Sequence, residues 1–430
     1  MSFLESDRDL SRNSYYAATT SRAHRHAPLS GAIRCDVAIV GGGLAGLSAA
    51  LDLAARGLDV VVLEARELGW GASGRNGGQA IHGLACGQDV IESQLGVDDA
   101  RRVWDMTIEA LDLLRERIAT HSIACDWRDG FLGVATSARK GRQLTEWADG
   151  LESTYRYPLT RVAPKDMPAW IASPRYHSAI HDPRSGHLHP LKYCLGLAAA
   201  VHKAGVRIFE NTEVTALKHG TPATLTTASG EVRAAQVLLA GNVYLQDVAP
   251  ALEARIMPVG TYIVCSEPLE PALADSLIPT RSAVCDTDFV LDYFRTTDDH
   301  CMLFGGRVSY STKTPANLQE SMRRRMVATF PQLASTKIRY AWGGFVDITM
   351  NRAPDFGRLS NNVYYLQGFS GHGLALTGLA GRVVAEAMTT DASRFDLFAR
   401  LKHRPFTGGR WTRTPALVLG MAWYRMKDLL

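Results

Sequence analysis

The sequence lacks the marks of disulfide-bonded, zinc-binding and membrane-spanning proteins. Its seven cysteines in 430 residues are odd in number and scattered, and no two form a C-x-x-C pair. Neither a disulfide framework nor a zinc site is therefore suggested, so we expect no bound metal and a cytoplasmic location, where thiols stay reduced. No stretch approaches the ~18 consecutive apolar residues of a spanning helix, and no transmembrane segment is predicted.

Strong charge of one sign is missing too. The formal net charge is only +4, and the one compact basic run, Arg323-Arg324-Arg325, is predicted to form the solvated face of a helix. We therefore expect no nucleic-acid partner. Residues 1–32 are polar and lack the apolar core of a signal peptide, so they are predicted to be a polar leader.

Residues 35–64 hold the most informative pattern in the chain. The apolar, β-branched run 35–40 predicts a buried parallel strand, and a G-x-G-x-x-G turn over 41–46 follows it. Apolar residues at helical spacing lead to a second strand, 59–63, which ends on Glu64. Strand, glycine turn, helix, strand and acid, in that order, predict a dinucleotide site rather than an ordinary tight turn.

Each part of this pattern has a physical reason. Gly41 permits the tight turn, Gly43 lets the backbone approach a pyrophosphate, and Gly46 lets the helix pack closely on the strand. The phosphates lie at the positive end of the helix, and Glu64 accepts hydrogen bonds from ribose hydroxyls. A carboxylate there repels a 2′-phosphate, which argues against NADP.

The loop that follows, residues 69–79, is too rich in glycine to be a helix interior or a strand. A flexible surface loop is one interpretation. However, small residues, amide side chains and the permanently charged Arg75 can together wrap a phosphate or the edge of a flavin.

With this loop, the chain resembles the FAD-binding amine and amino-acid oxidoreductases, the group of D-amino-acid oxidase, glycine oxidase and sarcosine oxidase. The resemblance covers nearly the whole sequence and implies FAD as the cofactor. It also implies non-covalent binding, because residues 368–373 contain no cysteine and no histidine lies between Glu64 and Gln79. The cofactor-binding residues it implies are Gly41, Gly43, Leu44, Ala45, Gly46, Glu64, Ala65, Gly71, Ala72, Ser73, Arg75, Asn76, Gly77, Gly78, Gln79, Val214, Gly241, Gly371, His372, Gly373 and Leu374.

A second glycine turn, residues 368–373, lies between a predicted strand (363–367) and a predicted helix (374–388). The positive end of that helix favours the negative charge that a reduced flavin develops at its N1–C2 edge. His372 adds to this effect if it is cationic, which makes it a catalytic candidate. A turn histidine satisfied by the backbone is an equally good interpretation.

Alternating strands between residues 257 and 307 predict an antiparallel sheet that roofs the flavin. Its candidate substrate-binding residues are Tyr262, Tyr293, Arg295 and Arg307. Tyr293 and Trp342 are also catalytic candidates, because aromatic rings can flank an amine. For each of these residues, the competing interpretation is that the side chain packs in the sheet or extends into solvent. Only a position in a concave part of the structure would decide between the two interpretations.

We therefore predict an α/β fold with a Rossmann-like FAD-binding domain and a second α+β substrate domain that contains an antiparallel sheet. The FAD-binding domain is expected to be discontinuous, over residues 33–88, 164–241 and 342–388. Residues 89–163 and 242–341 are predicted to form the substrate-binding or lid domain, and 389–430 a C-terminal extension. No oligomeric state is predicted.

Within the family, the resemblance is most specific to members that act on γ-glutamylated polyamines. It is carried by residues 14–18, 35–37, 71–79, 186–191, 241–245, 291–295 and 368–373. It implies hydride transfer from the α-carbon of a primary amine to flavin N5, imine hydrolysis to an aldehyde, and reduction of O2 to H2O2. Residues 343–347 depart from the expected pocket. An oxidase or dehydrogenase of an amino acid or a secondary amine such as L-pipecolate, a quinone-linked amine dehydrogenase, and a flavin-binding protein without turnover therefore stay as alternatives.

Overall fold

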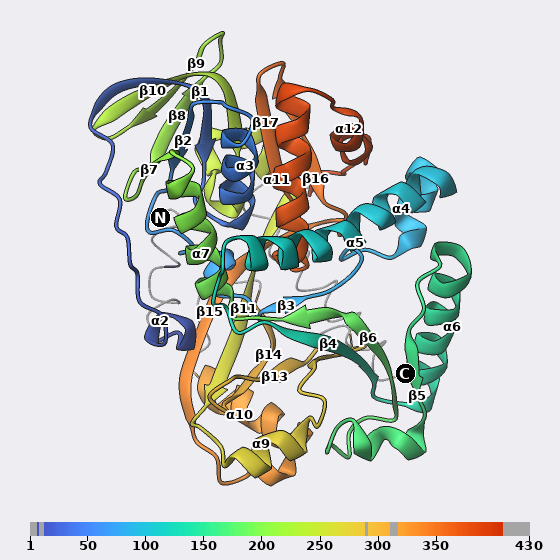
Figure 1. Ribbon diagram of the computed structural model, residues 1–430. Coiled ribbons are helices and arrows are strands. Elements are labelled where there is room, and N and C mark those ends of the chain that lie inside the picture. The colour runs from blue at the N-terminus through green and yellow to red at the C-terminus, as the bar shows by residue number, and fades with distance from the viewer. Residues whose placement is uncertain (1–6, 8–12, 289–290, 310–316, 407–430) are drawn as a thin grey trace.

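Two β-sheets organise the computed structural model, which describes residues 7, 13–288, 291–309 and 317–406 (Figure 1). The first sheet has the order β16 (Asp355–Ser360), β17 (Val363–Gln367), β10 (Gly230–Leu239), β1 (Gly31–Val40), β2 (Val60–Leu63) and β7 (Arg207–Phe209). The hairpin of β8 (Val214–Lys218) and β9 (Ala223–Thr227) extends it beside β10.

The centre of the first sheet is parallel, as the buried apolar runs predict. β1 pairs in parallel with both β2 and β10, and β10 pairs in parallel with β17. Residues 37–40 and 60–63 are buried throughout, because helices cover this sheet. The packed helices include α3 (Leu44–Ala54), α5 (Val97–Thr120), α7 (Pro190–Lys203) and α11 (Gly373–Thr389).

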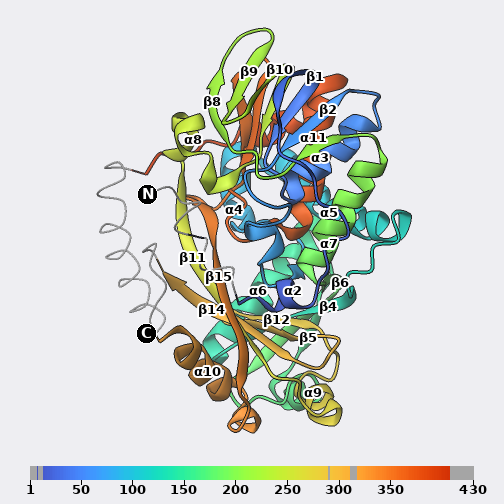
Figure 2. The ribbon, with the colours of Figure 1, turned by 90° about the vertical axis from the view of Figure 1, so that its left-hand side faces the viewer.

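The second sheet has nine strands, and its first half is antiparallel. Its order is β15 (Ile338–Thr349), β11 (Ile256–Ser266), β14 (Met302–Ser309), β13 (Tyr293–Thr296), β12 (Ala283–Asp286), β4 (Arg128–Ala135), β6 (Ser178–His187) and β3 (Gln79–Ala80), with β5 (Thr160–Val162) beside β6. β12 and β4 pair in parallel. β11 and β15 run side by side from this sheet toward the first one (Figure 2).

The two sheets confirm the predicted fold class, but three strands cross the predicted domain ranges. β3, β6 and most of β15 fall within 33–88, 164–241 and 342–388, which the sequence assigns to the FAD-binding domain, yet all three pair within the second sheet. Pairing partners far apart in the chain decide this membership, and the strands' own residues do not reveal it. The remaining part of the fold includes α2 (Tyr15–Ala18), α4 (Gln88–Leu95), α6 (Ala138–Tyr155), α9 (Pro271–Leu277), α10 (Leu318–Thr329) and α12 (Ser393–Ala399).

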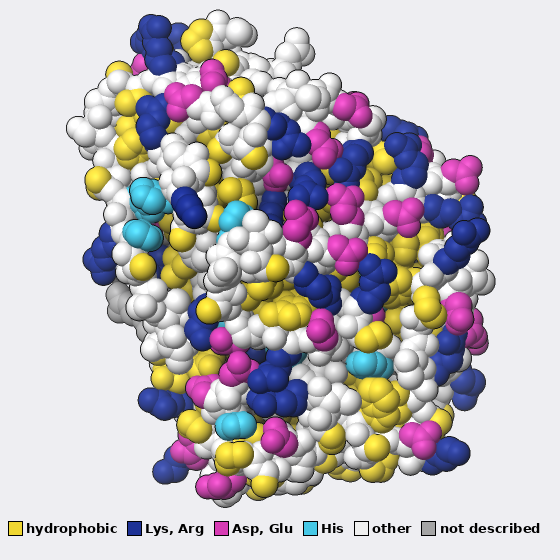
Figure 3. Space-filling model, in the orientation of Figure 1, with side chains coloured by type: hydrophobic (Ala, Val, Ile, Leu, Met, Phe, Trp, Pro, Cys, Tyr) yellow, Lys and Arg dark blue, Asp and Glu magenta, His cyan; other side chains and the backbone are white. Residues whose placement is uncertain are grey.

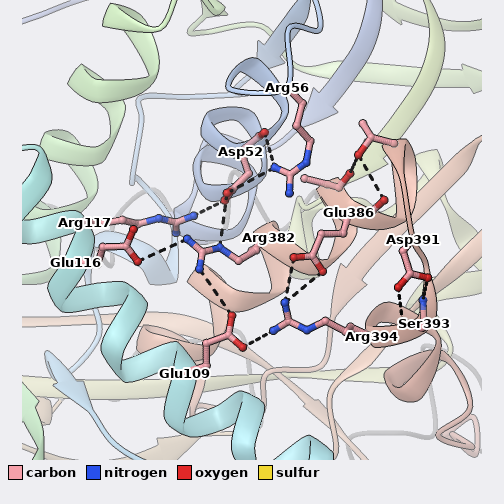
Figure 4. A network of polar contacts seen from close by, with 12 residues as sticks. Asp52, Arg56, Glu109, Glu116, Arg117, Arg382, Glu386, Asp391, Ser393 and Arg394 are labelled. Atoms are coloured by element: carbon pink, nitrogen blue, oxygen red, sulfur yellow. Dashed lines mark hydrogen bonds and ion pairs between the residues drawn. The ribbon is translucent and has the colours of Figure 1, made fainter.

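An ion-pair network joins the helices that cover the first sheet (Figure 4). Arg117 of α5 is buried, pairs with Asp52 of α3, and donates a hydrogen bond to Ser48 Oγ at 2.9 Å. Arg382 of α11 lies within 3.7 Å of both Asp52 and Glu109. The network therefore holds α3, α5 and α11 together as one layer.

The predicted leader and C-terminal extension are described in part. In the leader, Tyr15 and Tyr16 of α2 are buried against residues of β11, β14 and β15. Residues 407–430 lie outside the described residues. Among the helices that the structure does describe, none has the length and apolar character needed to span a membrane. On the face in Figure 3, acidic and basic side chains are intermixed, as the mild net charge suggests.

Candidate active site

A cavity of about 1130 Å³ is lined by residues from both sheets. The first sheet contributes the glycine turn after β1, Glu64 after β2, and Val214 of β8. The second sheet contributes Thr261, Tyr293 and residues 344–349. Every cofactor-binding residue predicted from the sequence lines this cavity except Gly46 and Gly78. The cavity therefore joins the predicted dinucleotide site to the predicted roof.

The first glycine turn has the shape that a pyrophosphate needs. Gly41 has a φ of +114°, and a Cβ there would lie 2.6 Å from the carbonyl oxygen of Ala240. A Cβ on Gly43 would lie 2.7 Å from Ser73 Oγ, which accepts a hydrogen bond from Leu44 N at 2.9 Å. Only glycine leaves this cradle open for a ligand, so the residues present fit the phosphates of FAD.

Gly46 does not line the cavity because it serves the packing behind it. A Cβ there would lie 2.0 Å from the carbonyl oxygen of Gly41. Gly78 is also placed behind the cavity wall, with a φ of +78° and no room for a Cβ beside the carbonyl oxygen of Leu188. Both glycines therefore shape the site without facing it.

The carboxylate of Glu64 both faces the cavity and holds the first glycine turn. Its Oε2 accepts a hydrogen bond from Gly42 N at 2.7 Å, and its Oε1 accepts one from Arg66 N at 2.9 Å. Burial raises the pKa of Glu64 above its ordinary value. The two backbone donors fix the direction of the acid relative to the turn.

Arg75 is the charged side chain of the glycine-rich loop, and it is buried in the cavity wall. Its guanidinium lies 4.2 Å from the centre of the Trp70 ring and 3.0 Å from the carboxylate of Asp7. The Tyr244 hydroxyl hydrogen-bonds to the same carboxylate. The sequence singled out Arg75 but gave no signal for Trp70, Tyr244 or Asp7, because their contacts come from distant parts of the chain.

Three predicted substrate or catalytic residues do not reach the cavity surface. Tyr262 is only 1% exposed within the core of the second sheet, whereas its neighbour Thr261 faces the cavity, because successive residues of a strand point to opposite sides. Trp342 is 1% exposed, and its Nε1 donates a hydrogen bond to the carbonyl oxygen of Arg75 at 2.9 Å.

Arg295 is the third of these residues and is 3% exposed. It donates hydrogen bonds to the carbonyl oxygens of Gly77 and Leu188, both at 3.0 Å, and to the Tyr16 hydroxyl at 3.3 Å. The guanidinium is therefore fixed behind the wall. Arg307 lies on β14, and its side chain is outside the described part of the structure.

Tyr293 does line the cavity. Its ring fills the space above two glycines, since a Cβ on Gly77 would lie 2.6 Å from the ring and one on Gly305 only 2.1 Å away. Burial raises the pKa of the Tyr293 hydroxyl well above its ordinary value, so the group stays protonated. It can offer a ring face and a neutral hydroxyl.

His372 lines the cavity at the start of α11. Its Nε2 lies 2.9 Å from the carbonyl oxygen of His82, so this nitrogen carries the hydrogen and donates it. Burial lowers the pKa of His372 to about 4, and the ring is therefore neutral at pH 7. The geometry therefore favours a neutral turn histidine that hydrogen-bonds to the backbone over a cationic histidine that stabilises a reduced flavin.

Five charged side chains line the cavity within the described residues: Glu64, Arg75, Glu213, Asp347 and Arg352. The sequence pointed to the first two. Asp347 belongs to the stretch that departs from the expected pocket, but nothing local indicated that its carboxylate is buried there.

Comparison with known proteins gives a consistent result. A family model described as FAD dependent oxidoreductase matches residues 36–387. The chain is 44% identical over 419 residues to the γ-glutamylputrescine oxidoreductase of Escherichia coli K12, covering 97% of this chain and 98% of the relative. It is 40% identical to the probable oxidoreductase OrdL of Haemophilus influenzae, covering 96% and 97%.

Among solved structures, glycine oxidase from Bacillus cereus matches with a TM-score of 0.70 at 18% identity. This match covers 86% of this chain and 99% of that one, so it shows a shared fold. Together, the family model, the relatives and the glycine cradle lead to one conclusion. The chain belongs to the family of FAD-dependent oxidoreductases, enzymes whose relatives act on amines and amino acids, and its cofactor is FAD.

Proposed function

We propose that this enzyme oxidises the primary amine of a γ-glutamylated polyamine, or a closely related amine, and passes the electrons to O2. The observation that carries the proposal is the 44% identity, over 97% of the chain, to a relative named for γ-glutamylputrescine. The geometry supports it, because one continuous cavity joins the FAD cradle to side chains of the second sheet.

In the proposed arrangement, FAD extends across this cavity. The first glycine turn and the loop 71–79 hold the pyrophosphate, Glu64 the ribose and Val214 the adenine. The turn 371–374 meets the flavin at the positive end of α11. Bound FAD would supply the acceptor for two electrons and the α-hydrogen of the amine.

Two thiols in the cavity support non-covalent binding. Cys86 and Cys285 line the cavity, but burial raises the pKa of each, to about 12 for Cys86. A protonated thiol is a poor nucleophile. His372 already donates through Nε2 to a backbone oxygen. Acid precipitation should therefore release the flavin into the supernatant, and colour retained in the pellet would refute this part of the proposal.

The protein's task is then to present a neutral amine and exclude water from its α-carbon. In this proposal Tyr293 flanks the amine, which is supported by its ring lining the cavity and by its hydroxyl staying protonated. The γ-glutamyl cap turns one ammonium group of the diamine into a neutral amide and adds a carboxylate beside an α-ammonium group. An arginine recognises a carboxylate well, because its guanidinium can donate two parallel hydrogen bonds to the two oxygens.

The two arginines that the sequence suggested for this clamp are not equivalent. Arg295 has its guanidinium bonded to two backbone carbonyls and a tyrosine hydroxyl. The proposed clamp is therefore Arg307, the other arginine that the sequence suggests, and it has to be tested by substitution because its side chain lies outside the described part of the structure.

An amine panel with a peroxide readout tests the proposed function. A γ-glutamyl-capped diamine should be oxidised under air with one H2O2 per aldehyde, and the free diamine much more slowly. The matched comparison is the same diamine capped with an acyl group that lacks a carboxylate. Equal rates on both capped forms would refute carboxylate recognition, and aldehyde without peroxide would refute O2 as the acceptor.

A further inference from the structure

Asp347 places a buried carboxyl group where three parts of the chain meet. It lies on β15, is 2% exposed, and lines the cavity. Its Oδ2 accepts a hydrogen bond from Gly368 N at 2.5 Å, and the backbone of Phe369 and the side chain of Asn242 also hydrogen-bond to it. The second sheet, the end of β10 and the second glycine turn are thus joined at one carboxyl group.

The turn that Asp347 braces is strained. The φ angles of Gly368, Ser370 and Gly371 are +76°, +53° and +84°, and a serine adopts this left-handed region only at an energetic cost. The carbonyl oxygen of Asp347 also accepts a hydrogen bond from Ser370 N at 3.0 Å. The turn leads directly into α11, whose positive end faces the cavity.

The groups that hydrogen-bond to Asp347 are all neutral. On the neighbouring elements, the carboxylate of Asp355 is paired with Arg255 at 3.3 Å, and Arg352 brings a positive charge to the cavity. His372 stays uncharged above about pH 4, because burial lowers its pKa to about that value.

The other neighbours of Asp347 do not change charge in the physiological pH range. Burial raises the pKa of Tyr244 far above its ordinary value, and the register partner of Asp347 on β11 is Pro258, which has no ionisable group. Burial raises the pKa of Asp347 itself to about 6. Among these groups, Asp347 is therefore the one whose charge changes closest to neutral pH.

We propose that Asp347 ties the reduction of the bound flavin to the uptake of a proton at the second glycine turn. This inference rests on the proposed placement of the flavin against that turn. Reduction adds negative charge to the cavity where a carboxylate is already present in a water-poor region. Because like charges close together disfavour ionisation of both, the proton affinity of Asp347 rises with reduction.

The chemical balance is simple. The amine would lose a hydride from its α-carbon and become an iminium ion, and bound FAD would accept the two electrons and one proton that the hydride carries. Asp347 takes a separate proton from solvent and returns it when O2 reoxidises the cofactor. Asp347 is thus a group that sets the charge of the site, and it forms no bond with the substrate.

The test is the pH dependence of the flavin midpoint potential in the holoenzyme between pH 5 and 9. Each proton coupled to a two-electron reduction changes the equilibrium tenfold per pH unit, which is about 30 mV. Above about pH 6, the midpoint potential of the wild type should fall more steeply with pH than that of Asp347→Asn. The difference between the two slopes should be about 30 mV per pH unit. Glu213→Gln removes a charge from an exposed side chain at the adenine end of the same cavity and should keep the wild-type slope.

The outcomes separate cleanly. A constant offset between wild type and Asp347→Asn, with identical slopes, would mean that Asp347 is only a structural brace and would overturn the inference. If that variant does not fold, a wild-type slope of one proton across pH 6–8 overturns the inference by itself. A protein that binds no FAD would instead overturn the cofactor placement on which the inference depends.

Discussion

Replacing Arg295 separates a structural arginine from a substrate-binding one. The side chain is 3% exposed and makes four hydrogen bonds, to Gly77 O, Leu188 O, Tyr16 Oη and His187 Nδ1. Arg295→Ala leaves two buried carbonyl groups, a hydroxyl and a ring nitrogen without this partner. An unsatisfied buried group costs about 1–3 kcal/mol, so with partial relaxation we expect a loss of about 3–5 kcal/mol in the free energy of unfolding.

Arg295→Ala should also act on the cofactor and on every substrate alike. Gly77 belongs to the loop that we propose against FAD, so release of its carbonyl loosens that loop. The assay is urea unfolding of the holoenzyme, followed by FAD titration and KM for the capped and free diamines. We expect weaker FAD binding and equal fractional losses on both amines.

Arg307→Ala is the contrasting variant. Loss of a charged hydrogen-bond partner costs about 1.5–3 kcal/mol, which is roughly tenfold to over a hundredfold in affinity, and the loss should fall on the capped amine alone. The reasoning is refuted if Arg295→Ala unfolds like the wild type and weakens only the capped amine. That result would make Arg295 the clamp.

Three further variants test the site and its support. Gly46→Ala puts a Cβ 2.0 Å from Gly41 O and should yield protein with little bound FAD, measured as the ratio of flavin to protein absorbance. Arg117→Ala removes the buried partner of Asp52, which keeps only the longer contacts to Arg382 at 3.7 Å and Arg56 at 3.8 Å, and should cost about 1.5–3 kcal/mol in urea unfolding, the range for a lost charged hydrogen bond; a loss under 1 kcal/mol would contradict this. Burial lowers the pKa of His372 from 6.5 to about 4, so the unfolded chain binds the proton first. Stability should therefore fall as pH drops from 6.5 to 4, by at most about 1.4 kcal/mol per unit, and His372→Gln should flatten this slope.

The glycine turns were predictable because their signals are local. A glycine at position 41 or 43 reports a backbone need that its immediate neighbours impose, and the strand–turn–helix order around it supplies the context. The same holds for Glu64 and for the turn before α11. For these parts of the site, a few dozen consecutive residues contain the information.

The walls of the cavity were harder to predict because they depend on pairing across the sheet. Which face of β11 meets the cavity decides between Thr261 and Tyr262, and that face is set by the register with β14 and β15. Asp347 gave no local signal, since its hydrogen-bond partners lie 21 residues away at Gly368 and about a hundred residues away at Asn242. A buried acid in a strand looks like any exposed one until its partners are known.

The residues that missed the cavity still explain why the second sheet is needed. Arg295 of β13 holds the carbonyl of Gly77, and Trp342 of β15 holds the carbonyl of Arg75. Both carbonyls belong to the loop proposed against FAD, which is too rich in glycine to keep one conformation by itself. Arg295 and Trp342, which the sequence suggested as substrate or catalytic residues, therefore lie behind the cavity wall. There they fix the backbone of the loop that is proposed to contact the cofactor. Two buried donors on a rigid sheet can position that loop more accurately than the loop's own contacts can, so the second sheet would serve the chemistry through this support as well as through the side chains that it presents to the cavity.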